Sequence, residues 1–410
     1  MDAMVERCCG LDVHKATVVA CVLIGRGRQE PQKMMRTFLT FTRHLEALRD
    51  WLVGLGVTQV AMESTGSYWV PVYRVLETAS SLELVVANAQ HIKNVPGRKT
   101  DVKDAEWIAK LVRHGLVRKS FVPPKDIREL RDFTRFRKTL VHERTRMRNQ
   151  LLKLLETANV KLGNVVSDVF GKTGTLMVAA LIAGEQTVEQ MTELACGRLR
   201  AKRDELSLAL DAKIDEHHRY LLQMQIERCK QVDASISDLD AQIDARLEPY
   251  RAQRRRLMQI PGVDRTLAAT LIAELGIDMS VFPTAGHVAA WAGVCPGNHE
   301  SAGKSKRGTT RKGNVHLKTA LTQAATSAQR TKETYLRDKY YRLKARRGGA
   351  RAAIAIARKI LTAAYYMLRD DVPYRELGAS YLDQADRKRV TTNLVRRLER
   401  LGYFVELRAA

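Results

Sequence analysis

The sequence predicts a mixed α/β domain at the N-terminus, followed by a mainly helical chain. Three observations predict this. Short apolar runs rich in β-forming residues alternate with helical patterns up to residue 120, Pro123 and Pro124 then interrupt the chain, and helical periodicity dominates after them. The chain has 410 residues, which is enough for two or three domains with separate cores.

The first of these domains is expected to contain five strands and three helices. The order β-β-β-α-β-α-β-α predicts a hairpin meander followed by βαβ crossovers, and hence a mixed sheet with helices packed on it. The expected strands are Cys8–Leu11, Thr17–Ile24, Met34–Phe41, Val57–Met62 and Leu82–Ala87, and the expected helices are His44–Leu55, Trp69–Thr78 and Asp104–His114.

Two long helical stretches are expected next. The first begins at Ile127 and is strongly basic, and the second runs from about Arg198 to Leu247. Apolar residues recur every three or four positions in the second stretch, at Cys229, Val232, Ile236, Leu239 and Ile243. This seam is compatible with an antiparallel helical hairpin, a coiled coil between two copies, or an ordinary buried helix face.

A compact helical domain is expected from Leu257 onward. The turn Ile260-Pro261-Gly262-Val263 is similar to a helix-hairpin-helix turn, whose backbone N–H groups would bind phosphate, although a plain turn fits as well. Basic residues then dominate, with eight and no acid in 301–332, and seven and no acid in 342–359. We expect domains at 1–122, 123–255 and 256–375, and a helical tail at 376–410.

The composition limits the classes of protein that fit. The net charge of +24 on a chain that is 45% hydrophobic predicts a globular protein with a polyanionic partner, and nucleic acid is the first candidate. No apolar run is long enough for a transmembrane helix, so no membrane partner is expected. The six cysteines form no CxxC pair, which argues against a disulfide framework or a structural zinc site and favours a reducing cytoplasm.

Four acidic residues suggest a metal site. Asp12 lies between two apolar strands, Glu63 ends a third, and Asp101 and Asp104 share one face at the start of a helix. If these elements are neighbours, the carboxylates converge and require cations, because like charges raise each other's pKa. Mg²⁺ prefers such oxygen ligands, and a pair of ions would suit phosphoryl transfer, with Mn²⁺ as an alternative. Taken singly, Asp101 and Asp104 also fit helix caps, and Glu63 the start of a loop.

The whole chain resembles the transposases of the IS110/IS1111 insertion-sequence family. The resemblance rests on the stretches GLDVHK, AMESTGSYW, GRKTDVKDAEWIAKL, IPGVDRTLAATLIAELG and SAGKSKRGTTRKGN. It implies an RNase H-like domain of the RuvC branch, a helical coiled-coil connector and a mainly helical C-terminal domain with a nucleophilic serine. Carried over by motif, the acidic set is Asp12, Glu63, Asp101 and Asp104, and the serine is Ser301.

Ser301 lies in a loop of small and basic residues. Such a loop permits close backbone approach to phosphate, and its cations would stabilise a pentacovalent phosphorane. A loop that only grips phosphate is the simpler interpretation; Ser305 is the nearest rival nucleophile, whereas Tyr335, Tyr340 and Tyr341 fit packing positions on a helix. The candidate nucleic-acid contacts are Lys304, Lys306, Arg307, Arg311, Lys312, Arg135, Arg144, Arg148 and Gly262.

The resemblance implies a recombinase that cuts and rejoins donor and target DNA through a 5′-phosphoserine. It also implies guidance by an RNA encoded in the element, a dimer or tetramer, and a bacterial, nucleoid-associated protein. Three other functions are alternatives: a RuvC-like endonuclease that uses water, an actin-like ATPase, and a non-catalytic scaffold. The sequence lacks the GxxxxGK[ST] nucleotide loop, and its second half is helical and basic, which argues against an ATPase.

Overall fold

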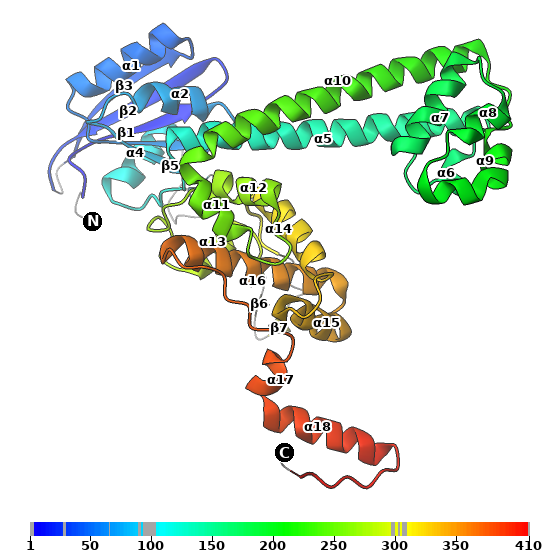
Figure 1. The fold of residues 1–410 in the computed structure, drawn as a ribbon. Coiled ribbons are helices and arrows are strands. Elements are labelled where there is room, and N and C mark those ends of the chain that lie inside the picture. The colour runs from blue at the N-terminus through cyan, green and yellow to red at the C-terminus, as the bar shows by residue number, and fades with distance from the viewer. Residues whose placement is uncertain are drawn as a thin grey trace. The chain divides into compact units, whose positions relative to one another are not determined.

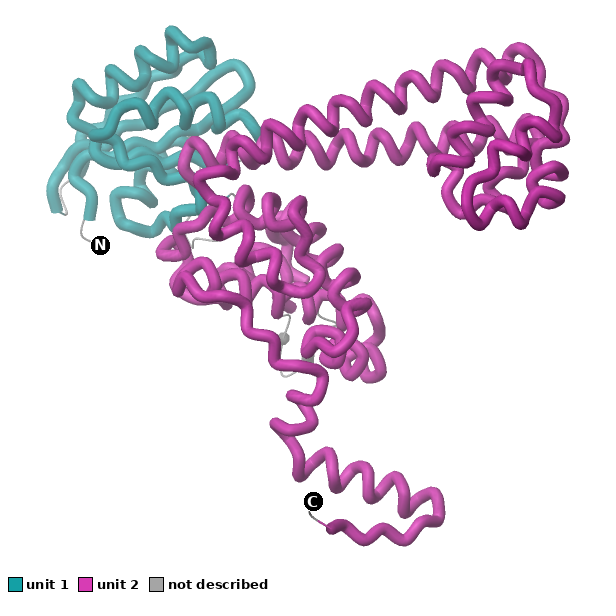
Figure 2. The backbone as a smooth tube through the Cα atoms, in the orientation of Figure 1, with its two compact units in different colours: residues 1–122 teal, residues 123–410 magenta. Residues whose placement is uncertain are grey.

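The computed structural model describes residues 4–27, 30–64, 66–88, 92, 104–296, 300–301, 304–305 and 310–408, with the backbone alone for 300–301 and 304–305. The chain divides into two compact units, Met1–Val122 and Pro123–Ala410 (Figure 2). None of the helices in these described ranges is both long and apolar enough to cross a lipid bilayer.

A five-stranded mixed sheet forms the centre of the first unit (Figure 1). Its strands are β1 (Arg7–Val13), β2 (Thr17–Ile24), β3 (Gln32–Leu39), β4 (Gln59–Glu63) and β5 (Glu83–Ala87), in the order β3-β2-β1-β4-β5. The first three strands form an antiparallel meander, whereas β4 is parallel to both β1 and β5. This order fits the RNase H-like fold that the resemblance implies, and the expected succession of strands and helices is confirmed for the described residues.

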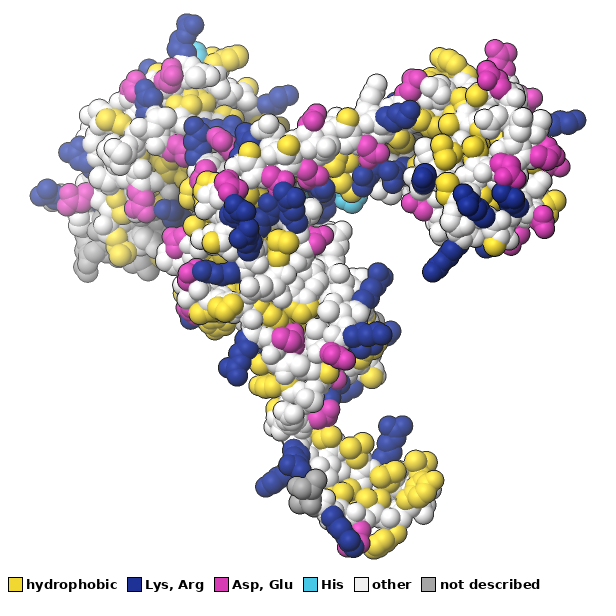
Figure 3. Space-filling view, in the orientation of Figure 1, with side chains coloured by type: hydrophobic (Ala, Val, Ile, Leu, Met, Phe, Trp, Pro, Cys, Tyr) yellow, Lys and Arg dark blue, Asp and Glu magenta, His cyan; other side chains and the backbone are white. Residues whose placement is uncertain are grey.

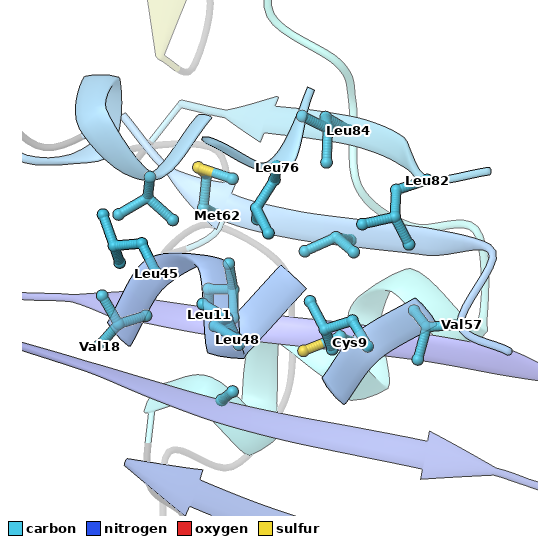
Figure 4. Packing of buried hydrophobic residues seen from close by; sticks show 14 of the residues in the cluster. Cys9, Leu11, Val18, Leu45, Leu48, Val57, Met62, Leu76, Leu82 and Leu84 are labelled. Atoms are coloured by element: carbon cyan, nitrogen blue, oxygen red, sulfur yellow. The ribbon is translucent and has the colours of Figure 1, made fainter. Parts of the chain in front are cut away.

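Helices cover both faces of this sheet, because successive side chains of a strand point to opposite sides. Cys9 and Leu11 of β1 pack in a core with Leu45 and Leu48 of α1 (Thr42–Gly54) (Figure 4). Helix α2 (Trp69–Leu76) contributes Val72 and Leu76 to the same core. Cys8 packs in a second core with α4 (Asp104–Arg113). The alternation along β1 therefore places even-numbered side chains on the α4 side.

The second unit begins with two long helices, α5 (Lys125–Thr157) and α10 (Glu216–Arg246). They are antiparallel, because Arg137 pairs with Asp240 while Gln150 pairs with Gln225. Between them in the sequence lies a helical lobe with its own core, made of α6 (Leu162–Val165), α7 (Lys172–Ala183), α8 (Val188–Glu193), η1 (Gly197–Lys202) and α9 (Arg203–Leu210).

The apolar seam of α10 is buried within this chain. Cys229, Ile236 and Ile243 are its most buried seam residues, so the structure supports the antiparallel hairpin; a coiled coil between two copies stays a prediction. The continuous helix expected from 198 to 247 is wrong. Residues 211–215 interrupt it, because Ala212 and Ile214 pack against the core of the lobe.

The rest of the second unit is mainly helical. Its elements are η2 (Glu248–Tyr250), α11 (Arg251–Leu257), α12 (Arg265–Leu275), α13 (Ala285–Trp291), β6 (Glu300–Ser301), β7 (Lys304–Ser305), α14 (Val315–Ala328), α15 (Tyr335–Arg347), α16 (Gly349–Arg369), α17 (Tyr381–Ala385) and α18 (Arg387–Arg400). Helix α18 buries no residue, and hydrophobic side chains gather on its surface (Figure 3). The domain boundaries expected at 255 and 375 stay predictions.

Candidate active site

Asp12 projects from β1 toward the α4 side of the sheet. Cys8 of β1 and Ala109 of α4 lie in the same core. Asp12 is four residues after Cys8 on the strand, so its side chain points to the same side of the sheet. The neighbouring strand β4 is in parallel register, with Leu11 opposite Met62. Ala61 of β4 also packs on the α4 side, so Glu63, two residues later, points to that side beside Asp12.

Gly10 allows α4 to lie directly on β1. A Cβ atom at this position would come within 2.3 Å of both the Ala105 carbonyl oxygen and the Ala109 backbone nitrogen. Only a residue without a side chain permits this approach. Asp104 is the first residue of α4 and directly precedes Ala105. The close packing of α4 on Gly10 therefore places Asp104 near the end of β1 that carries Asp12.

Asp12 interacts electrostatically with both Asp104 and Glu63. Burial raises the pKa of Asp12, the adjacent His14 opposes that increase, and the charges of Asp104 and Glu63 raise the pKa further. The Nε2 atom of His14 lies 3.0 Å from Oδ2 of Asp12. A carboxylate that is disfavoured in its charged form by neighbouring carboxylates is a group that a cation would stabilise.

The three carboxylates have the right chemistry for a divalent ion, but their oxygens are not all close enough to one another to bind one ion in this arrangement. Asp12, Glu63 and Asp104 offer carboxylates only, which suits a hard cation such as Mg²⁺. Within the described ranges, the one group of three whose ligand atoms all lie within 4.8 Å of one another is Asp215, His217 and His218. At least one pair of the three acids is therefore farther apart than that. The fourth expected ligand, Asp101, lies outside the described residues.

Ser301 lies in a loop whose two ends are fastened together. Its backbone forms a short antiparallel pair, with Ser301 opposite Lys304 and Glu300 opposite Ser305. We call residues 291–296 and 310–314 the neck of the serine loop. A β-bridge joins 296 to 310 there, and the backbone N–H of Asn314 donates to the Trp291 carbonyl at 3.1 Å.

Two glycines let the strands of this neck touch. A Cβ on Gly313 would lie 2.4 Å from the backbone nitrogen of Gly293, and 2.6 Å from the Trp291 carbonyl oxygen. Gly293 also has φ = +71°, a conformation that favours glycine. The described residues on the two sides of the Ser301 loop are therefore joined by close backbone contacts.

A buried acid anchors the neck to α5. Glu274 of α12 is 0% exposed, and it accepts hydrogen bonds from Arg135 at 2.8 and 2.9 Å and from the Asn314 side chain at 2.6 Å. Arg131 lies 3.3 Å from the same carboxylate. Burial opposes ionisation of Glu274, but the hydrogen bond from Arg135 and the charges of Arg131 and Arg135 hold its pKa below the ordinary value. Asn314 in turn caps α14 by accepting from the Leu317 N–H.

The arginines predicted to contact nucleic acid on α5 have acidic partners within the second unit. Arg135 binds Glu274, and Arg144 and Arg148 lie 3.0 and 3.3 Å from the carboxylate of Asp233 on α10. Arg311 and Lys312 are exposed in the neck. Only the backbone of Lys304 is described, and Lys306 and Arg307 lie outside the described residues. These contacts remain predictions.

Gly262 has an intramolecular role in the turn between α11 and α12. Its φ is +86°, and a Cβ there would lie 2.3 Å from the Ala324 carbonyl oxygen of α14. The side chain of Asp264 caps α12 by accepting from the Leu267 N–H at 2.7 Å. The turn therefore has a packing function, and phosphate binding by it stays a prediction.

Sequence reasoning did not identify Glu274 or the paired glycines of the neck. Glu274 is the only acid in the apolar run 267–275, which is the signal that a buried ion pair leaves in a sequence. Gly293 and Gly313 carry no such signal, because a close backbone approach between distant residues has no local pattern.

Comparison with known proteins gives a consistent result. Residues 9–160 match the family model of the DEDD transposase domain of IS110 elements, and residues 254–342 match the transposase family IS116/IS110/IS902. A probable family 20 transposase of Pseudomonas aeruginosa is 27% identical over 80% of this chain and 89% of its own length. A 42 kDa protein of insertion element IS900 from Mycobacterium paratuberculosis is 28% identical over 72% of this chain and 80% of its own.

Proposed function

The chain belongs to the IS110 family of transposases, and we propose that it cuts and rejoins DNA through a covalent bond between Ser301 and a 5′-phosphate. The observation that carries the proposal is the placement of Asp12, Glu63 and Asp104 on one side of the sheet, where burial and then the charges of Asp104 and Glu63 raise the pKa of Asp12. Transposases act on DNA, and carboxylates on one side of a sheet edge suit phosphoryl transfer with a divalent ion.

The acidic residues would hold Mg²⁺ or Mn²⁺, with Asp101 as the fourth ligand. When bound there, such an ion supplies positive charge to a phosphate and to the oxygens that react on it. His14 would orient Asp12 through the 3.0 Å contact between its Nε2 and the carboxylate. Gly10 would keep Asp104 in place by seating α4 on β1.

The proposed reaction is a pair of transesterifications. The Ser301 hydroxyl loses its proton and its oxygen attacks the scissile phosphorus, while the bond from phosphorus to the 3′-oxygen breaks and that oxygen takes up a proton. The 3′-hydroxyl of a second DNA end then attacks the phosphoserine and releases Ser301. Each bond broken is replaced by one of similar energy, so no nucleotide triphosphate is needed.

Two further properties belong to the same proposal. An RNA encoded in the element would select donor and target DNA by base pairing, so that the protein reads backbone shape instead of sequence. At least two copies of the chain would act together, because rejoining exchanged ends requires more than one cutting centre.

The deciding experiment incubates the full-length protein with DNA carrying the element ends, the RNA from the element, and Mg²⁺. We expect a covalent protein–DNA adduct that mass spectrometry maps to Ser301. Ser301→Ala should abolish the adduct, whereas Ser305→Ala, in the same loop, should retain it. If the protein is instead a RuvC-like endonuclease that uses water, the wild type forms no adduct and the Ser301→Ala variant still cuts DNA. This result would overturn the phosphoserine mechanism.

A further inference from the structure

A groove of about 1070 Å³ lies in the second unit beside the neck of the serine loop. Pro296 and Thr310, the bridged pair of the neck, form part of its wall. Most of the remaining wall comes from α13, α15 and α16, and both α13 and α15 pack against α16. The groove therefore lies next to the point where the chain enters and leaves the Ser301 loop.

Its lining carries one sign of charge. Among the described residues that line the groove there is no aspartate or glutamate, whereas five are basic, namely Lys339, Arg347, Arg351, Arg358 and Lys359. Within the described ranges, none of the five forms a salt bridge, and Lys339 lies over the Tyr335 ring at 5.3 Å. All of them except Lys339 are exposed to solvent. Unpaired cations in a concave surface concentrate the positive potential there.

The basic residues of α5 differ in this respect. Arg137 binds Asp240 with two hydrogen bonds of 2.5 and 2.9 Å, and Arg144 lies 3.0 Å from Asp233. Basic and acidic side chains alternate along the surface of this helix pair (Figure 3). A phosphate that approached these arginines would have to displace a carboxylate, whereas the cations of the groove have no carboxylate partner among the residues whose side chains the structure describes.

The spacing of the groove residues suits a polyanionic chain. Arg351 and Arg358 are two helical turns apart on α16, which corresponds to about 10 Å along the helix axis. Ile354 and Ala355 lie between them and give the groove an apolar floor. The cations would contact the phosphates of such a chain, and the apolar floor would contact the sugars between them. None of the described residues that line the groove is aromatic, so the proposed contact does not involve stacking of bases.

We propose that this groove binds the sugar–phosphate backbone of DNA next to the phosphate that Ser301 attacks, without regard to base sequence. The position of the scissile phosphate rests on the proposed function; the binding of DNA by these cations does not.

The test measures how the binding of a duplex DNA of arbitrary sequence depends on salt, using the full-length protein without divalent ions. Arg351→Gln with Arg358→Gln removes two unpaired cations of the groove. The slope of log K against log salt concentration should become shallower by about 2, since each phosphate contact contributes roughly 0.9. The Tm should stay unchanged, because neither arginine has an intramolecular ion pair in the described part of the chain.

The matched control removes two arginines that already have carboxylate partners. Arg137→Gln with Arg342→Gln changes the net charge by the same amount, and Arg342 lies on α15 with Asp338 and Asp383 as partners. This variant should lower the Tm and leave the salt slope unchanged. Equal slope changes in both variants would show a diffuse charge effect and would overturn the proposal, as would an unchanged slope in the groove variant.

Two more outcomes separate the inference from the proposed function. The groove variant is also tested with duplex RNA. If its salt slope becomes shallower for RNA but stays unchanged for DNA, the groove binds RNA and the proposal is overturned. If Ser301→Ala keeps its covalent adduct while the groove variant still shows the shallower DNA slope, the nucleophile is wrong and the groove is right.

Discussion

Replacing Gly10 by alanine is expected to push α4 away from β1 and so to move Asp104 relative to Asp12. The new Cβ atom would lie 2.3 Å from the Ala105 carbonyl oxygen and from the Ala109 nitrogen, and 3.0 Å from the Ala109 Cα. Non-bonded atoms need about 3.5 Å. The helix, or the strand beneath it, must therefore move by about 1 Å, and Asp104 moves with the helix.

The size of the effect follows from this displacement. Overpacking by one methyl group costs about 1–3 kcal/mol of unfolding free energy, which lowers the Tm of a unit of this size by several degrees. A shift of about 1 Å in a reacting group costs on the order of 100-fold in rate. We therefore expect Gly10→Ala to reduce DNA cleavage about 100-fold in a protein that still folds.

The assay compares two glycine-to-alanine variants by thermal unfolding and by Mg²⁺-dependent cleavage of element-end DNA. Gly54, the last residue of α1, is the control, because a Cβ there meets no atom within 4 Å. Gly54→Ala should keep full activity and gain up to about 1 kcal/mol from helix propensity. Wild-type Tm and wild-type cleavage in Gly10→Ala would refute the reasoning, since the close contact of α4 with β1 could then not be as described.

Three other predictions concern the acids and the neck. Glu274→Gln should cost about 3–5 kcal/mol, because two partly buried arginines lose their counter-ion. Since the pKa of Glu274 is lowered, its charge stabilises the wild-type protein above the ordinary value of 4.5 and progressively less as the pH falls below it. Acid titrations of Tm should show this slope in the wild type and lack it in the variant; parallel curves would contradict the assignment. Asp12→Asn should raise the Tm of the ion-free protein, because it removes a destabilised charge, and should abolish both cleavage and the Tm increase produced by Mg²⁺; an equal Mg²⁺ response in wild type and variant would place the ion elsewhere. Gly313→Ala should open the neck and reduce adduct formation at least about tenfold, whereas Gly163→Ala, with no atom within 4 Å of the new Cβ, should match the wild type; equal adduct yields would show that the neck does not position Ser301.

The strands of the first unit could be predicted because their signal is local. β2 has the predicted bounds, and β1 extends the predicted run by a few residues at its ends. Alternation along β1 and β4 then places Asp12 and Glu63 on one side of the sheet. The role of Gly10 could not be predicted, because a close approach requires knowing which helix packs over the strand.

The pairing of charges on α5 could not be predicted for the same reason. The partners of Arg137 and Arg144 lie 103 and 89 residues farther along the chain. A basic helix whose partner is unknown looks like a nucleic-acid surface. The interruption at 211–215 was equally inaccessible, because it depends on the lobe core into which Ile214 packs.

The distance along the chain between α5 and α10 has a consequence for synthesis. A ribosome releases the cationic α5 first and must add the whole lobe before the carboxylates of α10 emerge. During that interval the nascent segment carries uncompensated positive charge, which attracts ribosomal and messenger RNA. Folding of the lobe brings the two helices together and ends this exposure. Conditions that delay folding of the lobe should therefore prolong nonspecific RNA association of the newly made chain, before it meets its DNA.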